Sequence, residues 1–192
     1  MEKIRSFLAI EIPEILHPLM EELQRKLKET RADVKWVAPQ NIHLTLKFFG
    51  AISPEKLAQV SQIILPIVAH CPPFSITISG LGCFPSRHRP RVIWLGINNG
   101  NREIVLLQKE IEGKLLAAGF PAEERPFTPH LTMGRVRSGR NLSELQPLIV
   151  ANQNLELGTF AVREIVLFKS DLKPTGAVYT RLRTFSFREI GS

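Results

Sequence analysis

Regular alternation of apolar and polar residues predicts β-strands along much of this chain. The clearest case is 74–80, Phe-Ser-Ile-Thr-Ile-Ser-Gly, in which every second side chain is polar. Successive side chains on a strand point to opposite faces, so one face of this segment meets the core and the other meets water. Similar patterns predict strands over 5–10, 34–37, 41–49, 92–97, 127–133, 159–169 and 177–187.

Apolar residues recur with helical spacing in other segments. Between 13 and 30 they form one stripe, and Glu and Lys occupy the opposite side. Ser53 followed by Pro54 is typical of a helix start, and this helix is predicted to run to about Ala69. Further helices are predicted over 101–118 and 142–150. The amphipathic strands favour antiparallel sheets with helices outside, which is an α+β class.

A tetrapeptide within one predicted strand recurs in the second half of the chain. His43-Leu44-Thr45-Leu46 returns as His130-Leu131-Thr132-Met133. On a strand, each histidine shares a face with the threonine two residues later, and the apolar residues face the other way. A single histidine in such a place is usually structural. Two copies indicate duplicated halves, and hence a bilobal molecule whose two histidine strands line a central cleft.

Composition narrows the class of protein. A length of 192 residues, 44% hydrophobic and 22% charged, is typical of a soluble globular protein with a substantial core. The apolar runs are too short for a membrane helix, the N-terminus lacks the features of a signal peptide, and we expect a cytoplasmic protein. Cys71 and Cys83 match no metal or redox spacing. The net charge of +7 favours an anionic partner, which charge alone leaves open among membrane surfaces, nucleotides and nucleic acids.

Two histidines that face one centre suit in-line displacement at phosphorus. Imidazole gains and loses protons near neutral pH, so one ring can accept a proton from water while the other protonates the departing oxygen. Thr45 and Thr132 can donate hydrogen bonds to phosphate oxygens. A metal site is the rival hypothesis, but catalytic zinc needs three protein ligands, and His70 or His88 would have to come from elsewhere in the fold.

Both motifs and their surroundings resemble the two-histidine (2H) phosphoesterase family, and more closely its RNA 2′,3′-cyclic phosphodiesterases, also called 2′-5′ RNA ligases. The similarity extends over essentially the whole chain. Besides the two tetrapeptides, it is carried by 5–10, 36–50, 82–85 with 91–94, 125–132 and 167–179.

The resemblance implies a bilobal fold of two antiparallel sheets related by a pseudo-twofold axis, forming one domain over 1–192. It implies hydrolysis of RNA 2′,3′-cyclic phosphate ends to 2′-phosphomonoesters without a metal or other cofactor, with reverse 2′-5′ joining in some members. It also implies that His43 is the proton donor and His130 the proton acceptor, which the nearly symmetric motifs do not decide. We expect an RNA substrate, no membrane partner and a monomer. A non-catalytic RNA-end-binding module and a metal-dependent phosphoesterase stay open as alternatives.

Other candidate residues each have an ordinary structural interpretation. Arg135 matches a family arginine suited to a phosphate, although its odd offset from His130 puts it on the wrong face unless Gly134 interrupts the strand. The segment 87–91 either is a solvated basic loop or steers RNA phosphates. Lys47 either holds substrate or reaches solvent. Aromatic residues that either stack on a base or belong to the core are Trp36, Phe84, Trp94 and Tyr179.

Overall fold

The structure is a computed structural model that describes residues 3–174 and 176–188. Its strands are β1 (Ile4–Glu11), β2 (Val34–Trp36), β3 (His43–Ile52), β4 (Phe74–Phe84), β5 (Val92–Ile97), β6 (His130–Val136), β7 (Glu156–Val162), β8 (Glu164–Lys173) and β9 (Gly176–Ser186). Its helices are α1 (His17–Lys28), α2 (Pro54–Val68), α3 (Asn101–Ala117) and α4 (Leu142–Ala151), with short 3-10 turns η1 (Glu14–Leu16) and η2 (Pro39–Asn41). The α+β class predicted from the sequence is confirmed.

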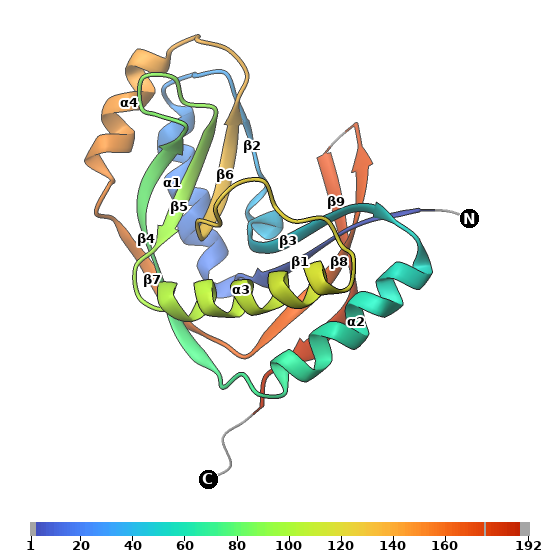
Figure 1. Cartoon of the computed structure of the whole chain (residues 1–192). Coiled ribbons are helices and arrows are strands. Elements are labelled where there is room, and N and C mark those ends of the chain that lie inside the picture. Colours follow the sequence, from blue (N-terminus) through green and yellow to red (C-terminus); the bar gives the residue numbers. More distant parts are fainter. Residues whose placement is uncertain (1–2, 175, 189–192) are drawn as a thin grey trace.

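The prediction of two separate sheets is wrong. In the described residues, the strands form one antiparallel sheet in the order β7-β4-β5-β6-β3-β1-β8-β9, with β2 also paired to β6 (Figure 1). The halves are joined where Leu44 of β3 pairs with Leu131 of β6. This pairing satisfies backbone groups that two separate sheets would leave exposed along their edges.

Several element boundaries also differ from the sequence-based expectation. The predicted strand 159–169 is two strands, because the chain turns at Arg163 so that β7 pairs with β4 and β8 with β1. The strand predicted over 74–80 continues to Phe84. The second histidine begins its strand, whereas the predicted strand 127–133 placed it in the middle, since β6 runs from His130 to Val136. The Ser53 cap is confirmed, with its hydroxyl accepting a hydrogen bond from the Lys56 amide at 3.4 Å.

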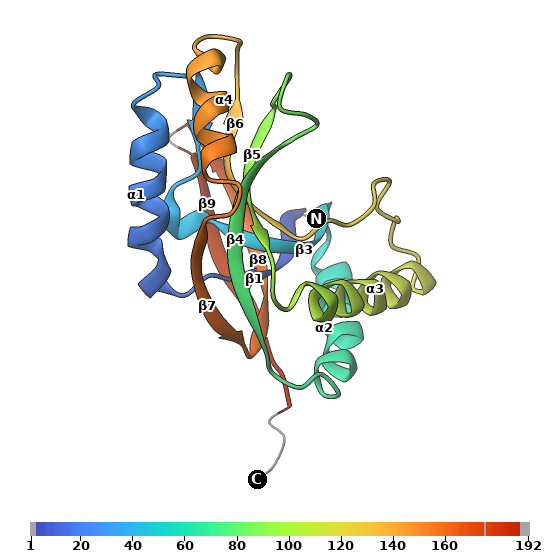
Figure 2. The same cartoon turned by 90° about the vertical axis from the view of Figure 1, so that its left-hand side faces the viewer.

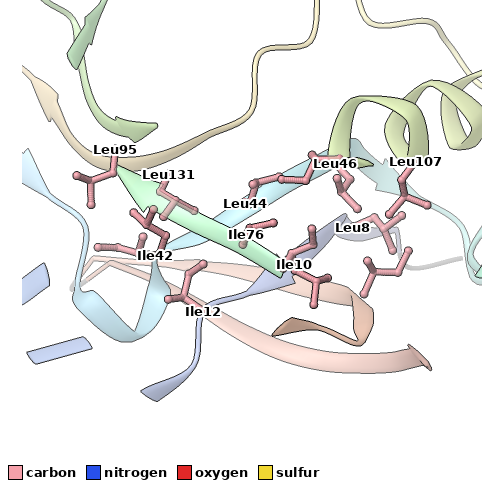
Figure 3. Close-up of a cluster of buried hydrophobic side chains, with 14 of the residues drawn as sticks. Leu8, Ile10, Ile12, Ile42, Leu44, Leu46, Ile76, Leu95, Leu107 and Leu131 are labelled. Atoms are coloured by element: carbon pink, nitrogen blue, oxygen red, sulfur yellow. The ribbon is translucent and has the colours of Figure 1, made fainter. Parts of the chain in front are cut away.

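One core lies behind the joined strands. It contains side chains from both halves of the sheet and from all four helices. Figure 3 shows part of it, with Leu8 and Ile10 of β1, Leu44 of β3, Leu131 of β6 and Leu107 of α3. Helices α1 and α4 lie outside the β4–β5–β6 half, and α2 and α3 lie beside β1 and β3 (Figure 2). Both histidine strands are therefore supported from behind by the same packed layer.

The single domain predicted over 1–192 includes residues 1–2, 175 and 189–192, which lie outside the described residues. Among the helices that the structure describes, none is both long and apolar enough to cross a membrane.

Candidate active site

The two histidine motifs lie side by side on adjacent strands. Because β3 and β6 are antiparallel and Leu44 pairs with Leu131, His43 is level with Thr132 and Thr45 is level with His130. Both leucines are fully buried, whereas the histidines and threonines are accessible on the opposite face. Residues placed diagonally across such a pair are about 7–8 Å apart. The two imidazoles thus flank a space that suits one phosphate group.

A cleft of about 1020 Å³ opens over this face. Its floor includes His43, Thr45 and Thr132, and Arg135 also lines it. His130 is placed beside it by its register with Thr45. The hairpin of β8 and β9 forms one wall, and β2 with the end of β6 forms the other (Figure 1). The structure therefore brings four of the five residues selected from the sequence into one cleft, and the strand register places the fifth, His130, next to Thr45.

Both imidazoles are oriented by the same kind of hydrogen bond. Nδ1 of His43 is 2.8 Å from the Asn41 carbonyl oxygen, and Nδ1 of His130 is 2.7 Å from that of Thr128. A carbonyl oxygen only accepts, so each Nδ1 carries a hydrogen and donates it. Each Nε2 is therefore the ring atom left available for proton exchange, able to accept when the ring is neutral and to donate when it is charged.

The surroundings of the two rings differ. His43 stacks on Phe7, with ring centroids 4.6 Å apart, and meets the edge of Tyr179 at 5.3 Å. This burial lowers the pKa of His43, an effect that its hydrogen bond to the Asn41 carbonyl partly opposes. His130 instead meets the edge of Phe84 at 5.2 Å. In the free protein, His43 is accordingly biased toward the neutral form.

Phe7 is a further residue of the site that the sequence patterns did not indicate. Its buried ring contacts His43, Phe168 and Tyr179, forming a small apolar cluster on the cleft side of the sheet. The available signal was its place in the strand predicted over 5–10. Of the aromatic candidates, Tyr179 and Phe84 contact the histidines, Trp94 packs against Phe84 at 5.1 Å, and Trp36 lines the cleft.

Each histidine strand contains a β-bulge at the same distance after its histidine. The pairing of β3 with β1 skips Leu46, and the pairing of β6 with β5 skips Met133. A bulge adds one residue and so reverses which face the following side chains occupy. Arg135 consequently lines the cleft together with Thr132, which resolves the objection from strand alternation.

The same irregularity takes Lys47 away from the cleft. Its side chain is buried, with Nζ 2.9 Å from Glu112 Oε1 and 2.8 Å from the Pro121 carbonyl oxygen. Both interpretations offered by the sequence, a substrate contact or a solvated lysine, are wrong. Lys47 instead connects β3 to α3 and to the segment that leads to His130.

The basic loop between β4 and β5 is exposed but does not line the cleft. Arg87, Arg89 and Arg91 are all exposed, and the Arg87 carbonyl accepts a hydrogen bond from Gln146 Nε2 at 2.7 Å. The loop follows Phe84, which contacts His130. A role in steering RNA stays a prediction.

Charge in the cleft is strongly biased. Arg5, Lys35, Arg135 and Lys173 line it, and no described lining residue is an aspartate or glutamate. Within the described residues, no cluster of three or more His, Cys, Asp or Glu side chains is arranged to hold a metal ion. The cleft thus presents cationic groups and the His43 imidazole to an anionic ligand, with His130 beside it.

Comparison with known proteins finds relatives over nearly the whole length of the chain. The chain is 39% identical over 183 residues to the RNA 2′,3′-cyclic phosphodiesterase of Methanothermobacter thermautotrophicus, covering 95% of this chain and 98% of the relative. It is 37% identical to that of Methanocaldococcus jannaschii, covering 92% and 96%. The crystal structure of E. coli LigT in apo form superposes with a TM-score of 0.78 at 28% identity, covering 98% of this chain and all of that one.

A second E. coli LigT structure, complexed with 3′-AMP, superposes with a TM-score of 0.79 at 26% identity, covering 98% of this chain and 100% of that one. A family model described as LigT-like phosphoesterase matches residues 10–94 and again residues 95–179, so each match contains one histidine motif. The chain belongs to the LigT-like phosphoesterase family.

Proposed function

We propose that this protein hydrolyses RNA 2′,3′-cyclic phosphate ends to 2′-phosphomonoesters. The observation that carries the proposal is the placement of the two motifs: both imidazoles lie on one face of the sheet, diagonal to each other, with a threonine level with each. Its close relatives are RNA 2′,3′-cyclic phosphodiesterases, which supports the same substrate.

The reaction follows from the two Nε2 atoms. His130, the acceptor, takes a proton from a water molecule as the water oxygen attacks phosphorus. The bond from phosphorus to the 3′ oxygen breaks on the opposite side, and His43, the donor, protonates that oxygen. The product keeps its phosphate on the 2′ oxygen. Reverse 2′-5′ joining uses the same groups with their roles exchanged, as microscopic reversibility requires.

The threonines and Arg135 bind the phosphate. Thr45 and Thr132 donate hydrogen bonds to its non-bridging oxygens, and the Arg135 guanidinium binds two oxygens at once. Because all three residues lie on strands of the sheet, their backbone positions are set before the substrate arrives, and the donors can stabilise charge that develops on the oxygens in the transition state.

The low pKa of His43 fits the donor role once the substrate is considered. In the free protein the ring is biased toward neutrality by burial. An anionic cyclic phosphate next to the ring favours its charged form, so binding the substrate also loads the proton that the reaction needs. A donor with a low pKa then releases its proton readily to the departing oxygen.

The test is incubation with RNA that ends in a 2′,3′-cyclic phosphate, in the presence of a chelator, with the monoester identified against authentic 2′- and 3′-phosphates. We expect the 2′-phosphate alone. His43→Ala and His130→Ala should each lower kcat about 10²–10⁴-fold. The matched control is His70→Ala, because His70 is exposed and also binds a carbonyl oxygen through Nδ1, that of Pro66 at 2.8 Å.

Three results would contradict the proposal. Near wild-type turnover in either histidine variant would remove the division into acid and base. Binding of cyclic-ended RNA without product would favour a non-catalytic RNA-end-binding module. Activity that a chelator abolishes, and that zinc or manganese restores, would favour a metal-dependent phosphoesterase.

A further inference from the structure

Arg5 is a cleft residue outside both histidine motifs. Its exposed side chain lines the same cleft as His43 and Arg135. The guanidinium lies over the ring of Phe48, with Cζ 4.5 Å from the ring centroid. In the described part of the chain, no carboxylate lies within ion-pairing distance of Arg5. The group is thus held in place by an aromatic ring while its charge and hydrogen-bond donors stay available.

The level of this guanidinium along the sheet can be read from the strand register. On β1, Ala9 pairs with Thr45, and Phe7 pairs with Phe48, the ring on which Arg5 stacks. Two residues of a strand span about 7 Å. The ring on which the guanidinium stacks therefore sits at a register position about 7 Å beyond Thr45 along the sheet, which is about one nucleotide step.

Tyr179 links the two arginines in space. Burial raises the pKa of its hydroxyl group, and the positive charges of Arg135 and Arg5 partly offset that rise. Both guanidiniums line the same cleft as Tyr179, one belonging to β6 and the other to β1. The cleft therefore carries a cationic group on β1 in addition to the one on β6 that follows Thr132.

We propose that Arg5 binds a second phosphate of the substrate, the phosphodiester on the 5′ side of the terminal nucleotide. This inference rests on the proposed function and adds a specificity: the site would recognise the end of an RNA chain rather than any cyclic nucleotide. A nucleoside 2′,3′-cyclic phosphate lacks that second phosphate, and a dinucleotide with the same cyclic end has it.

The experiment compares these two substrates in wild type and in Arg5→Ala. We expect KM for the dinucleotide to rise about tenfold or more, because a charge-assisted contact is lost, while kcat and KM for the cyclic mononucleotide stay within about twofold. The dependence of log KM for the dinucleotide on log salt concentration should weaken by about 0.7, the value for one phosphate contact to a single strand. Arg5→Lys should keep the salt dependence and recover part of the affinity.

The matched control is Arg102→Ala, since Arg102 is an exposed arginine at the start of α3, away from the cleft, and its loss changes the net charge equally. It should affect neither substrate. Equal losses of Arg5→Ala on both substrates, or no loss on either, would overturn the second phosphate contact. Wild-type inactivity on both substrates would instead overturn the proposed function, so the two failures can be told apart.

Discussion

The buried lysine behind the site provides a sharp test of how the two histidine strands are held together. Only 3% of the Lys47 side chain is exposed, and its ammonium lies 2.9 Å from Glu112 Oε1. The same Glu112 oxygen accepts the backbone N–H of Glu123 at 2.9 Å. Lys47 also donates to the Pro121 carbonyl. The same ammonium lies 3.7 Å from Glu123 Oε1, so Lys47 and its two carboxylate partners fasten the segment between α3 and β6 to β3.

Lys47→Met keeps the apolar length of the side chain but leaves the Glu112 carboxylate without its cation. Breaking a buried ion pair from one side typically costs about 3–5 kcal/mol. Glu112 is 20% exposed and keeps some hydration, so we expect the lower end, about 3 kcal/mol. For a chain of this length, such a loss lowers the melting temperature by roughly 6–12 °C.

The assay is a double-mutant cycle measured by urea and thermal unfolding. Lys47→Met and Glu112→Gln are each expected to destabilise the protein, and the double variant should lose clearly less than the sum because neither charge is then stranded. Lys109→Met on the exposed side of α3 is the control and should change the free energy of unfolding by less than about 0.5 kcal/mol. Additive losses, or a Lys47→Met variant as stable as wild type, would refute the ion-pair argument.

Two further predictions concern the site. Because burial lowers the pKa of His43 and the proposed donor must be protonated, kcat/KM should fall as pH rises through a value below the ordinary histidine pKa of 6.5. Phe7→Leu admits water to the His43 ring, so it should move this fall in kcat/KM to higher pH. A fall at an unchanged pH would contradict the donor role. In Gly134→Ala, the new Cβ would lie 2.6 Å from Val34 Cγ1 and 3.0 Å from Trp36 Cε3, so β2 must shift and Arg135 with it. We expect this variant to have a lower melting temperature and a higher KM. The control Gly139→Ala, with no atom within 4 Å of its Cβ, should leave the melting temperature and KM unchanged.

Local patterns were sufficient for the helices and most strands because each depends on residues close in sequence. They were insufficient for the number of sheets, since pairing between β3 and β6 joins residues far apart in the chain. The sequence pattern around Arg163 likewise does not show that the strand before it pairs with β4 and the strand after it with β1. Such choices depend on which edges meet in three dimensions, and a one-dimensional pattern does not encode that.

Of the residues at and behind the site, some could be placed from the sequence and others could not. The histidines and threonines follow simple strand alternation from a repeated motif, and the structure places them together. Arg135 and Lys47 depend on the bulges at Met133 and Leu46, whose apolar side chains are ordinary strand residues. A bulge is defined by what the neighbouring strand does, so the faces of residues beyond it require the pairing to be known.

The point of contact between the halves explains why the distance between the His43 and His130 imidazoles is well defined. The two strands pair at Leu44 and Leu131, and both leucines are fully buried in the common core. Each imidazole belongs to the residue just before one of these leucines, and the two lie on opposite strands. A packed apolar contact therefore sets the separation of the imidazoles, and no flexible loop is involved. Beyond this pair the strands diverge to different partners, β1 for β3 and β5 with β2 for β6, and the cleft opens between them. The pairing that joins the halves therefore also sets the distance between His43 and His130.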